Sequence, residues 1–128
     1  MHRSAPDDSR PLLFTREQRL VDGVRFRAVF DAPDYRVSDR HFLILARRNG
    51  LPHARLGLVV GRRRARRAVD RGALKRRARE QFRLRQYELA GLDLIVLLRA
   101  PCPADGGRGA TPLLAGLLDK LLAKRGQD

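Results

Sequence analysis

Residues 66–86 read RRAVDRGALKRRAREQFRLRQ, and this stretch decides the fold. Four cationic residues recur at every fourth position: Arg71, Lys75, Arg79 and Arg83. Three apolar residues recur at the same spacing: Leu74, Ala78 and Phe82. Because residues four apart lie on one face of a helix, the pattern predicts a helix with an apolar edge towards a core and a cationic edge towards a ligand.

Positive charge is concentrated around this helix. Between residues 62 and 85 the chain has twelve Lys or Arg residues but only two acids, Asp70 and Glu80, and its overall formal net charge is +14. An excess of this size favours a polyanion, nucleic acid first, as the ligand. The two acids are interpreted as ion-pair partners of arginines within the helix and not as a general acid/base pair. No intrinsic catalytic residue is predicted.

Apolar runs and turn residues outline the other elements. A helix is expected over residues 22–31, with Asp22 as its N-cap. Residues 42–46 and 56–60 are predicted to be paired strands, and residues 93–99 form a run that is apolar on both faces, as in a central strand. A last amphipathic helix is expected over residues 113–124. This order predicts an α+β fold, an α/β sandwich of helices against a small sheet.

The chain is long enough for one domain. The expected boundaries are a flexible segment over residues 1–13, a domain over residues 14–124 and a tail over residues 125–128. No apolar run approaches the length of a membrane span and the first residues lack a signal-peptide pattern, so a cytoplasmic protein is expected. The single cysteine, Cys102, fits a reducing compartment. The three histidines share no metal-ligand spacing, and no metal site is predicted.

An ordered set of motifs resembles the protein component of bacterial ribonuclease P. The motifs are LGLVV at residues 56–60, Arg62-Arg63, RRAVDR at 66–71, LKR at 74–76, REQFR at 79–83 and DLIV at 93–96. The resemblance spans about residues 14–122. It implies a mixed sheet in which the basic helix makes a left-handed crossover between parallel strands, against the usual right-handed rule.

The resemblance also implies a function. In this family an RNA subunit removes the 5′ leader from precursor tRNA by endonucleolytic cleavage, using magnesium ions that it holds itself. The small protein binds the leader and docks on the catalytic RNA. The implied partners are therefore the catalytic RNA and the precursor tRNA 5′ leader, with no membrane and no DNA. No cofactor held by protein ligands alone is expected, and Mg²⁺ is expected through the RNA subunit.

Site residues follow from the resemblance, position by position. The leader cleft is assigned to two aromatic residues and three cations: Phe26, Phe30, Arg71, Lys75 and Arg79. Docking on the catalytic RNA is assigned to five arginines: Arg62, Arg63, Arg66, Arg67 and Arg76. A cationic groove with aromatic faces suits single-stranded nucleic acid. From spacing alone, the two phenylalanines are better explained as core residues, and it is the resemblance that favours partial exposure.

One motif departs from the family pattern. The family's Arg-Asn-Arg appears here as Arg71-Gly72-Ala73, without the amide and the second guanidinium. Leader binding is expected to persist, because positions 72 and 73 leave the helix in another direction. For docking on the catalytic RNA two outcomes are open: docking is weakened, or Arg66, Arg67 and Arg77 compensate for the missing groups. Restoring both family residues is expected to tighten that docking. The alternatives are a basic ribosomal or structural RNA-binding protein, a relic with weakened holoenzyme docking, and a self-sufficient nuclease.

Overall fold

The computed structural model describes residues 14–101, 105 and 107–128, so the segment predicted to be flexible, residues 1–13, and Cys102 lie outside the described residues. The described part contains a short 3₁₀ helix, three α-helices and four strands. Along the chain they are η1 (Arg16–Gln18), α1 (Gly23–Asp31), β1 (Tyr35–Ser38), β2 (Phe42–Arg48), β3 (Arg55–Val59), α2 (Ala68–Leu84), β4 (Leu92–Leu98) and α3 (Ala110–Arg125). The predicted α+β class is confirmed.

The four strands form one mixed sheet in the order β1-β2-β4-β3. β2 pairs antiparallel with β1 and with β4, whereas β3 pairs parallel with β4. The prediction that residues 42–46 pair with residues 56–60 is therefore wrong, because β4 lies between these two strands. Almost every residue of β4 is buried, so its backbone groups need partners on both sides, and the central place supplies them.

Strand β1 has no counterpart among the elements predicted from the sequence. It has only four residues, and the side chains alternate between buried Tyr35 and Val37 and the more exposed Arg36 and Ser38. A pattern this short is weak as a sequence signal. It forms because the sheet offers an open edge on β2, with Tyr35 opposite Ala46.

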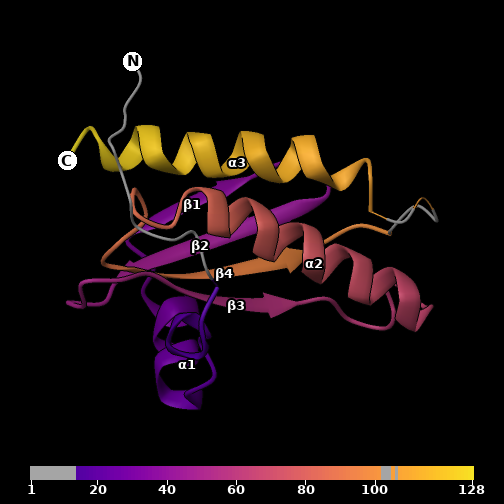
Figure 1. Cartoon of the computed structure of the whole chain (residues 1–128), viewed down its shortest axis with the longest axis horizontal. Helices are drawn as coiled ribbons and strands as arrows, with labels where there is room; N and C mark the ends of the chain where they lie inside the picture. Colours follow the sequence, from indigo (N-terminus) through magenta and orange to yellow (C-terminus); the bar gives the residue numbers. More distant parts are fainter. Residues whose placement is uncertain (1–13, 102–104, 106) are drawn as a thin grey trace.

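The basic helix connects two neighbouring parallel strands, β3 and β4. In Figure 1, α2 and α3 lie on one side of the sheet and α1 lies on the other. This arrangement fixes α2 beside the edge strand β3. The left-handed sense that the resemblance implies for the β3–α2–β4 connection stays a prediction.

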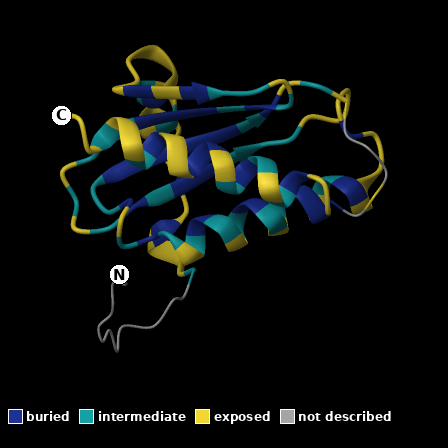
Figure 2. Ribbon diagram, turned by 90° about the horizontal axis from the view of Figure 1, so that it is seen from above, coloured by how far each residue is buried: buried dark blue, intermediate teal, exposed yellow. Residues whose placement is uncertain are grey.

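Side chains of β3 alternate between two hydrophobic cores. Leu56 and Leu58 belong to the large core shared with α2 and α3, whereas Val59 packs in the smaller core under α1. Figure 2 shows the buried residues of α2 and α3 along the helix faces that meet the sheet. The edge strand β3 therefore separates two surfaces of the molecule, one bordered by α2 and one by α1.

The structure shows how two helices, α1 and α3, begin. The carboxylate of Asp22 accepts hydrogen bonds from the backbone amides of Val24 at 2.9 Å and Arg25 at 3.4 Å, which confirms the predicted N-cap of α1. α3 begins at Ala110, three residues earlier than predicted. Pro112 does not prevent this start, because it lies in the first helical turn, where a backbone N–H has no intrahelical acceptor.

Candidate nucleic-acid interface

The two acids of the basic helix are ion-paired, as predicted. Asp70 accepts from Arg67 Nε at 2.8 Å and Nη2 at 3.0 Å, and Glu80 accepts from Arg83 Nη2 at 2.7 Å. These guanidinium hydrogen bonds lower the pKa of the Asp70 and Glu80 carboxyls below their ordinary values. Each acid thus neutralises one neighbouring arginine and leaves the other cations of α2 without a carboxylate on the same helix.

Arg71, the first residue of the predicted cationic face, has a structural role. Its Nη1 donates to the carbonyl oxygens of Ala65 and Arg66, both at 2.9 Å. Ala65 is buried, and its backbone amide donates to the carbonyl of Gly61. Arg71 therefore holds the loop that precedes α2 against the start of the helix.

Lys75 and Arg79 line a groove beside β3. The groove has a volume of about 160 Å³ and is lined by Phe14, Arg19, Leu56, Leu58, Lys75 and Arg79; we call it the cationic groove. No carboxylate of the described residues lies within ion-pair distance of its three cations. Its lining combines three apolar residues with three cations, which suits a flexible polyanion with planar bases.

The aromatic pair predicted for the leader cleft lies on the other side of β3. The rings of Phe26 and Phe30 are in contact, with centroids 5.6 Å apart. Phe26 covers Gly57, where a Cβ atom would lie only 2.6 Å from its ring, and it packs in the small core. Phe30 is 39% exposed. The structure therefore places the aromatic pair and Lys75 with Arg79 on opposite sides of the same edge strand.

The arginines assigned to docking on the catalytic RNA form an exposed surface at the start of α2. Arg62, Arg63 and Arg66 lie in the loop after β3, Arg67 is the N-cap residue of α2, and Arg76 lies two turns further along the helix. All five are exposed, and Arg67 is the one among them that is paired with an acid of this helix, Asp70. Helix α2 connects this surface with the cationic groove, because it carries Arg76 of the surface and Lys75 and Arg79 of the groove.

The two departures from the family motif differ in their surroundings. A Cβ atom on Gly72 would meet nothing within 4 Å, so this position is open. Ala73 is only 3% exposed, and the turn at Gly107 packs against its backbone. An arginine restored at position 73 would start from this buried site, so the turn at Gly107 or its neighbours would have to shift to admit it. The tighter docking expected from the restored pair stays a prediction.

These surroundings predict opposite effects on stability. Gly72→Ala is expected to raise the free energy of unfolding by up to about 1 kcal/mol, because alanine favours an exposed helix interior over glycine. Ala73→Arg is expected to lower it by about 1 to 3 kcal/mol through overpacking. Urea unfolding of the two variants measures both changes in the free energy of unfolding. Equal stabilities of the two variants would contradict the difference in packing between positions 72 and 73.

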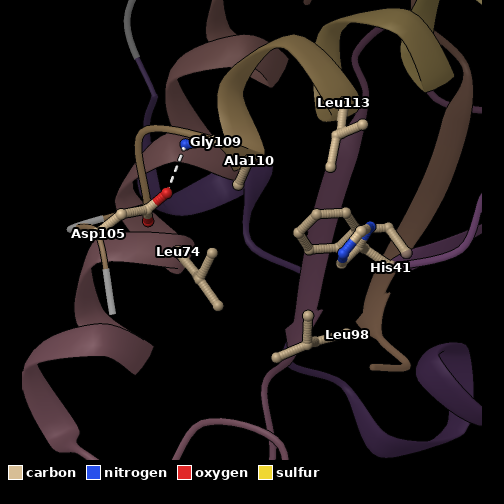
Figure 3. Close-up of a pocket in the computed structure, with 8 residues that line it drawn as sticks. His41, Leu74, Leu98, Asp105, Gly109, Ala110 and Leu113 are labelled. Carbon is tan, nitrogen blue, oxygen red and sulfur yellow. Dashed lines mark hydrogen bonds between the residues drawn. The ribbon is translucent and has the colours of Figure 1, made fainter. Parts of the chain in front are cut away.

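A second cavity, of about 210 Å³, lies between β2, β4, α2 and α3 (Figure 3). Its lining is apolar except for His41 and Asp105. The Asp105 carboxylate accepts from the backbone amides of Gly107 at 2.9 Å and Gly109 at 3.1 Å, and His41 Nδ1 has no hydrogen-bond partner among the residues described. The described residues of its lining include no lysine or arginine, so they offer a phosphate backbone no such cation.

Residues 14–20 contribute to the cationic groove, and the sequence-based predictions missed this contribution. Phe14 and Arg19 line the groove, yet neither belongs to a periodic pattern. The available signal was the Thr15-x-x-Gln18 capping box, in which the Thr15 amide donates to Gln18 Oε1 at 2.7 Å. That motif marks residues 15–18 as ordered but says nothing of where they pack.

The described residues offer neither a metal site nor a membrane span. No group of three or more His, Cys, Asp or Glu side chains there is arranged to hold a metal ion. Among the same residues, no helix combines the length and the apolar character that crossing a membrane requires.

Comparison with known proteins places this architecture and charge pattern in a family. Residues 14–121 match the sequence profile of the family described as Ribonuclease P. The chain is 51% identical over 111 residues to the ribonuclease P protein component of Alcanivorax borkumensis, covering 87% of this chain and 92% of that protein. It is 50% identical over 86 residues to the protein of the same name from Pseudomonas aeruginosa, covering 67% of this chain and 64% of that one.

Solved structures agree with the fold. The RNase P protein from Thermotoga maritima superposes with a TM-score of 0.60 at 28% identity, over 77% of this chain and 89% of that one. The RNase P protein of Staphylococcus aureus has a TM-score of 0.65 over 84% of this chain and 94% of that one, at 23% identity, and supports the fold alone. The chain belongs to the ribonuclease P protein family.

Proposed function

We propose that this protein is the RNA-binding subunit of ribonuclease P, acting in the cytoplasm with a catalytic RNA that removes the 5′ leader from precursor tRNA. The observation that supports this most directly is the cationic groove on α2, whose Lys75 and Arg79 lack carboxylate partners in the described chain. Family membership supplies the class of partner. Unpaired cations along a groove bind a phosphate backbone with little demand on base sequence.

The proposal assigns the chemistry to the RNA subunit and to the Mg²⁺ ions that the RNA holds. The protein supplies positive charge where two polyanions, the catalytic RNA and its substrate, must approach each other. Lys75 and Arg79 would bind leader phosphates, whereas the exposed arginines at positions 62, 63, 66, 67 and 76 would face the catalytic RNA. Arg71 would contribute mainly by holding the loop that presents these arginines.

The aromatic pair is proposed as a second binding surface for the leader on the α1 side of β3. Phe30→Leu is expected to keep the fold, because the ring is 39% exposed, and to lower leader affinity by about 1 to 3 kcal/mol by removing a stacking surface. Phe26→Leu is the contrasting variant, since Phe26 packs on Gly57 and its removal should lower the melting temperature. A Phe30→Leu protein with full leader affinity and a lowered melting temperature would assign both rings to the core.

Capture of bound RNA separates this proposal from a basic ribosomal or structural RNA-binding protein. The full-length chain, tagged and expressed in its own cells, is recovered and its RNA is sequenced. Enrichment of the ribonuclease P RNA together with tRNA precursors is expected. Enrichment of ribosomal RNA alone would contradict the proposal, and recovery of precursors without the catalytic RNA would indicate a relic that no longer docks in the holoenzyme.

A further inference from the structure

Residues 14–20 form one border of the cationic groove. The backbone amide of Leu20 donates to the carbonyl of Leu56 at 2.9 Å, and Arg19 forms a parallel bridge with Leu56 on the outer edge of β3. Phe14 and Arg19 thereby come to line the same groove as two side chains of α2, Lys75 and Arg79. The groove is assembled from segments that are more than fifty residues apart in the sequence.

This segment is fixed to the end of α2 by buried contacts. The side-chain amide of Gln18, only 6% exposed, donates to Gln86 Oε1 at 2.8 Å, and Gln86 Nε2 in turn donates to the carbonyl of Arg83 at 3.0 Å. The ring of Phe14 meets the buried ring of Phe82 edge to face, with centroids 5.6 Å apart. A polar pair with both partners buried specifies one position for the segment, so this wall of the groove is formed before any ligand binds.

Arg19 has the chemistry of a binding residue for single-stranded RNA. It is exposed, it has no carboxylate partner among the described residues, and its guanidinium carbon lies 5.8 Å from the centroid of the Phe14 ring. A guanidinium held over an aromatic ring presents a planar, cationic face on which a base can stack.

We propose that Arg19, held on Phe14, is a further RNA-binding residue of this protein. It stacks on a base of the single-stranded leader while Lys75 and Arg79 bind phosphates beside that base. This inference rests on the proposed function, and it adds the N-terminal segment to the site. In this proposal the Gln18–Gln86 hydrogen bond positions Arg19 in the same groove as the two cations of α2.

The test is a titration of the full-length protein into a fluorescein-labelled single-stranded RNA of leader length, at several salt concentrations. Arg19→Ala is expected to weaken binding by roughly tenfold. Arg19→Lys keeps the charge without the planar face, so it should keep the salt dependence of binding but not the full affinity. Wild-type affinity in the Arg19→Lys protein would overturn the stacking role.

Two matched controls each remove one exposed arginine outside the groove. Arg16 lies in the same segment, and Arg36 lies on β1 at the opposite edge of the sheet. Both alanine variants should bind nearly as the wild type does. If Arg19→Ala behaves like these controls while Lys75→Ala is weakened, the inference is overturned and the proposed function stands. If Lys75→Ala also binds normally, the groove is not the leader site, and both the inference and the assignment of leader binding to the groove fail.

Discussion

A protein with both Lys75→Ala and Arg79→Ala is expected to bind single-stranded leader RNA about a hundredfold more weakly than the wild type. Each side chain lines the cationic groove without a carboxylate partner in the described chain, so each is available to a phosphate. A hydrogen bond to a charged group contributes about 1.5 kcal/mol or more, and removing two of them gives roughly this factor. The slope of log affinity against log salt should also fall by about 0.7 for each phosphate that the protein no longer neutralises.

Fluorescence anisotropy across a salt series measures both quantities. The control is a double variant that removes the same charge, Arg36→Ala with Lys120→Ala, whose residues are exposed on β1 and α3. Only the small, long-range part of the attraction should disappear in this control. Equal weakening in the two double variants would mean that net charge, and not the groove, determines leader binding. A change in leader sequence preference with an intact salt slope would mean that Lys75 and Arg79 bind bases.

The largest expected effect on stability comes from Asp93→Ala. Asp93 lies near the start of the central strand and accepts two hydrogen bonds from Arg55 of β3, from Nε and Nη2, both at 2.7 Å. The Arg55 and Asp93 side chains are only 16% and 6% exposed, and the amide of Asn49 donates to the same carboxylate at 2.9 Å. The carboxylate raises the pKa of Arg55, chiefly through the hydrogen bond between them. Removal of Asp93 leaves a largely buried guanidinium without its partner, which should lower the free energy of unfolding by about 3 to 5 kcal/mol.

Urea unfolding at neutral pH gives the free energy directly. Asp93→Asn is the matched control, because it keeps an acceptor oxygen and the side-chain volume while removing the charge, and a smaller destabilisation is expected. The ion pair matters for the site because it holds β3, which contributes Leu56 and Leu58 to the cationic groove, against β4. An alanine variant as stable as the asparagine variant would show that Arg55 is solvated well enough to need no partner.

The helices could be predicted from local chemistry, whereas the order of the strands could not. The N-cap at Asp22 and the four-residue period of α2 depend on neighbours within a turn or two, and the structure confirms both elements. The order of strands in the sheet depends on which strand is buried on both faces and therefore takes a central place, as β4 does. The apolar run of β4 indicated a central strand, but adjacency of residues 42–46 and 56–60 in the chain suggested a pairing that β4 prevents. Strands β3 and β4 compete for the same edge of β2, and neither strand's own sequence shows which of them will pair there.

In the candidate site, too, the residues on one helix could be predicted from the sequence, whereas those brought in by long-range contacts could not. The period of α2 brought Lys75 and Arg79 to one face, and the structure places them in one groove. Arg19 could not be found by spacing, because its place depends on a bridge to Leu56, a residue that follows it by 37 positions. Ala73 illustrates the opposite case. The resemblance suggests that an RNA-binding arginine of the family motif is missing there, and only the structure shows that this position is buried beside the turn at Gly107.

Reconstitution of the full-length protein with its cognate catalytic RNA at low magnesium tests the central claim most directly. The measured quantity is the initial rate at which the 5′ leader is cleaved from precursor tRNA. Positive charge on the protein should lower the repulsion between the two RNAs, so the wild-type protein should raise this rate, and the Lys75→Ala, Arg79→Ala double variant should raise it much less. No increase with the wild-type protein, or cleavage by the protein without the RNA, would contradict the assignment as an accessory RNA-binding subunit.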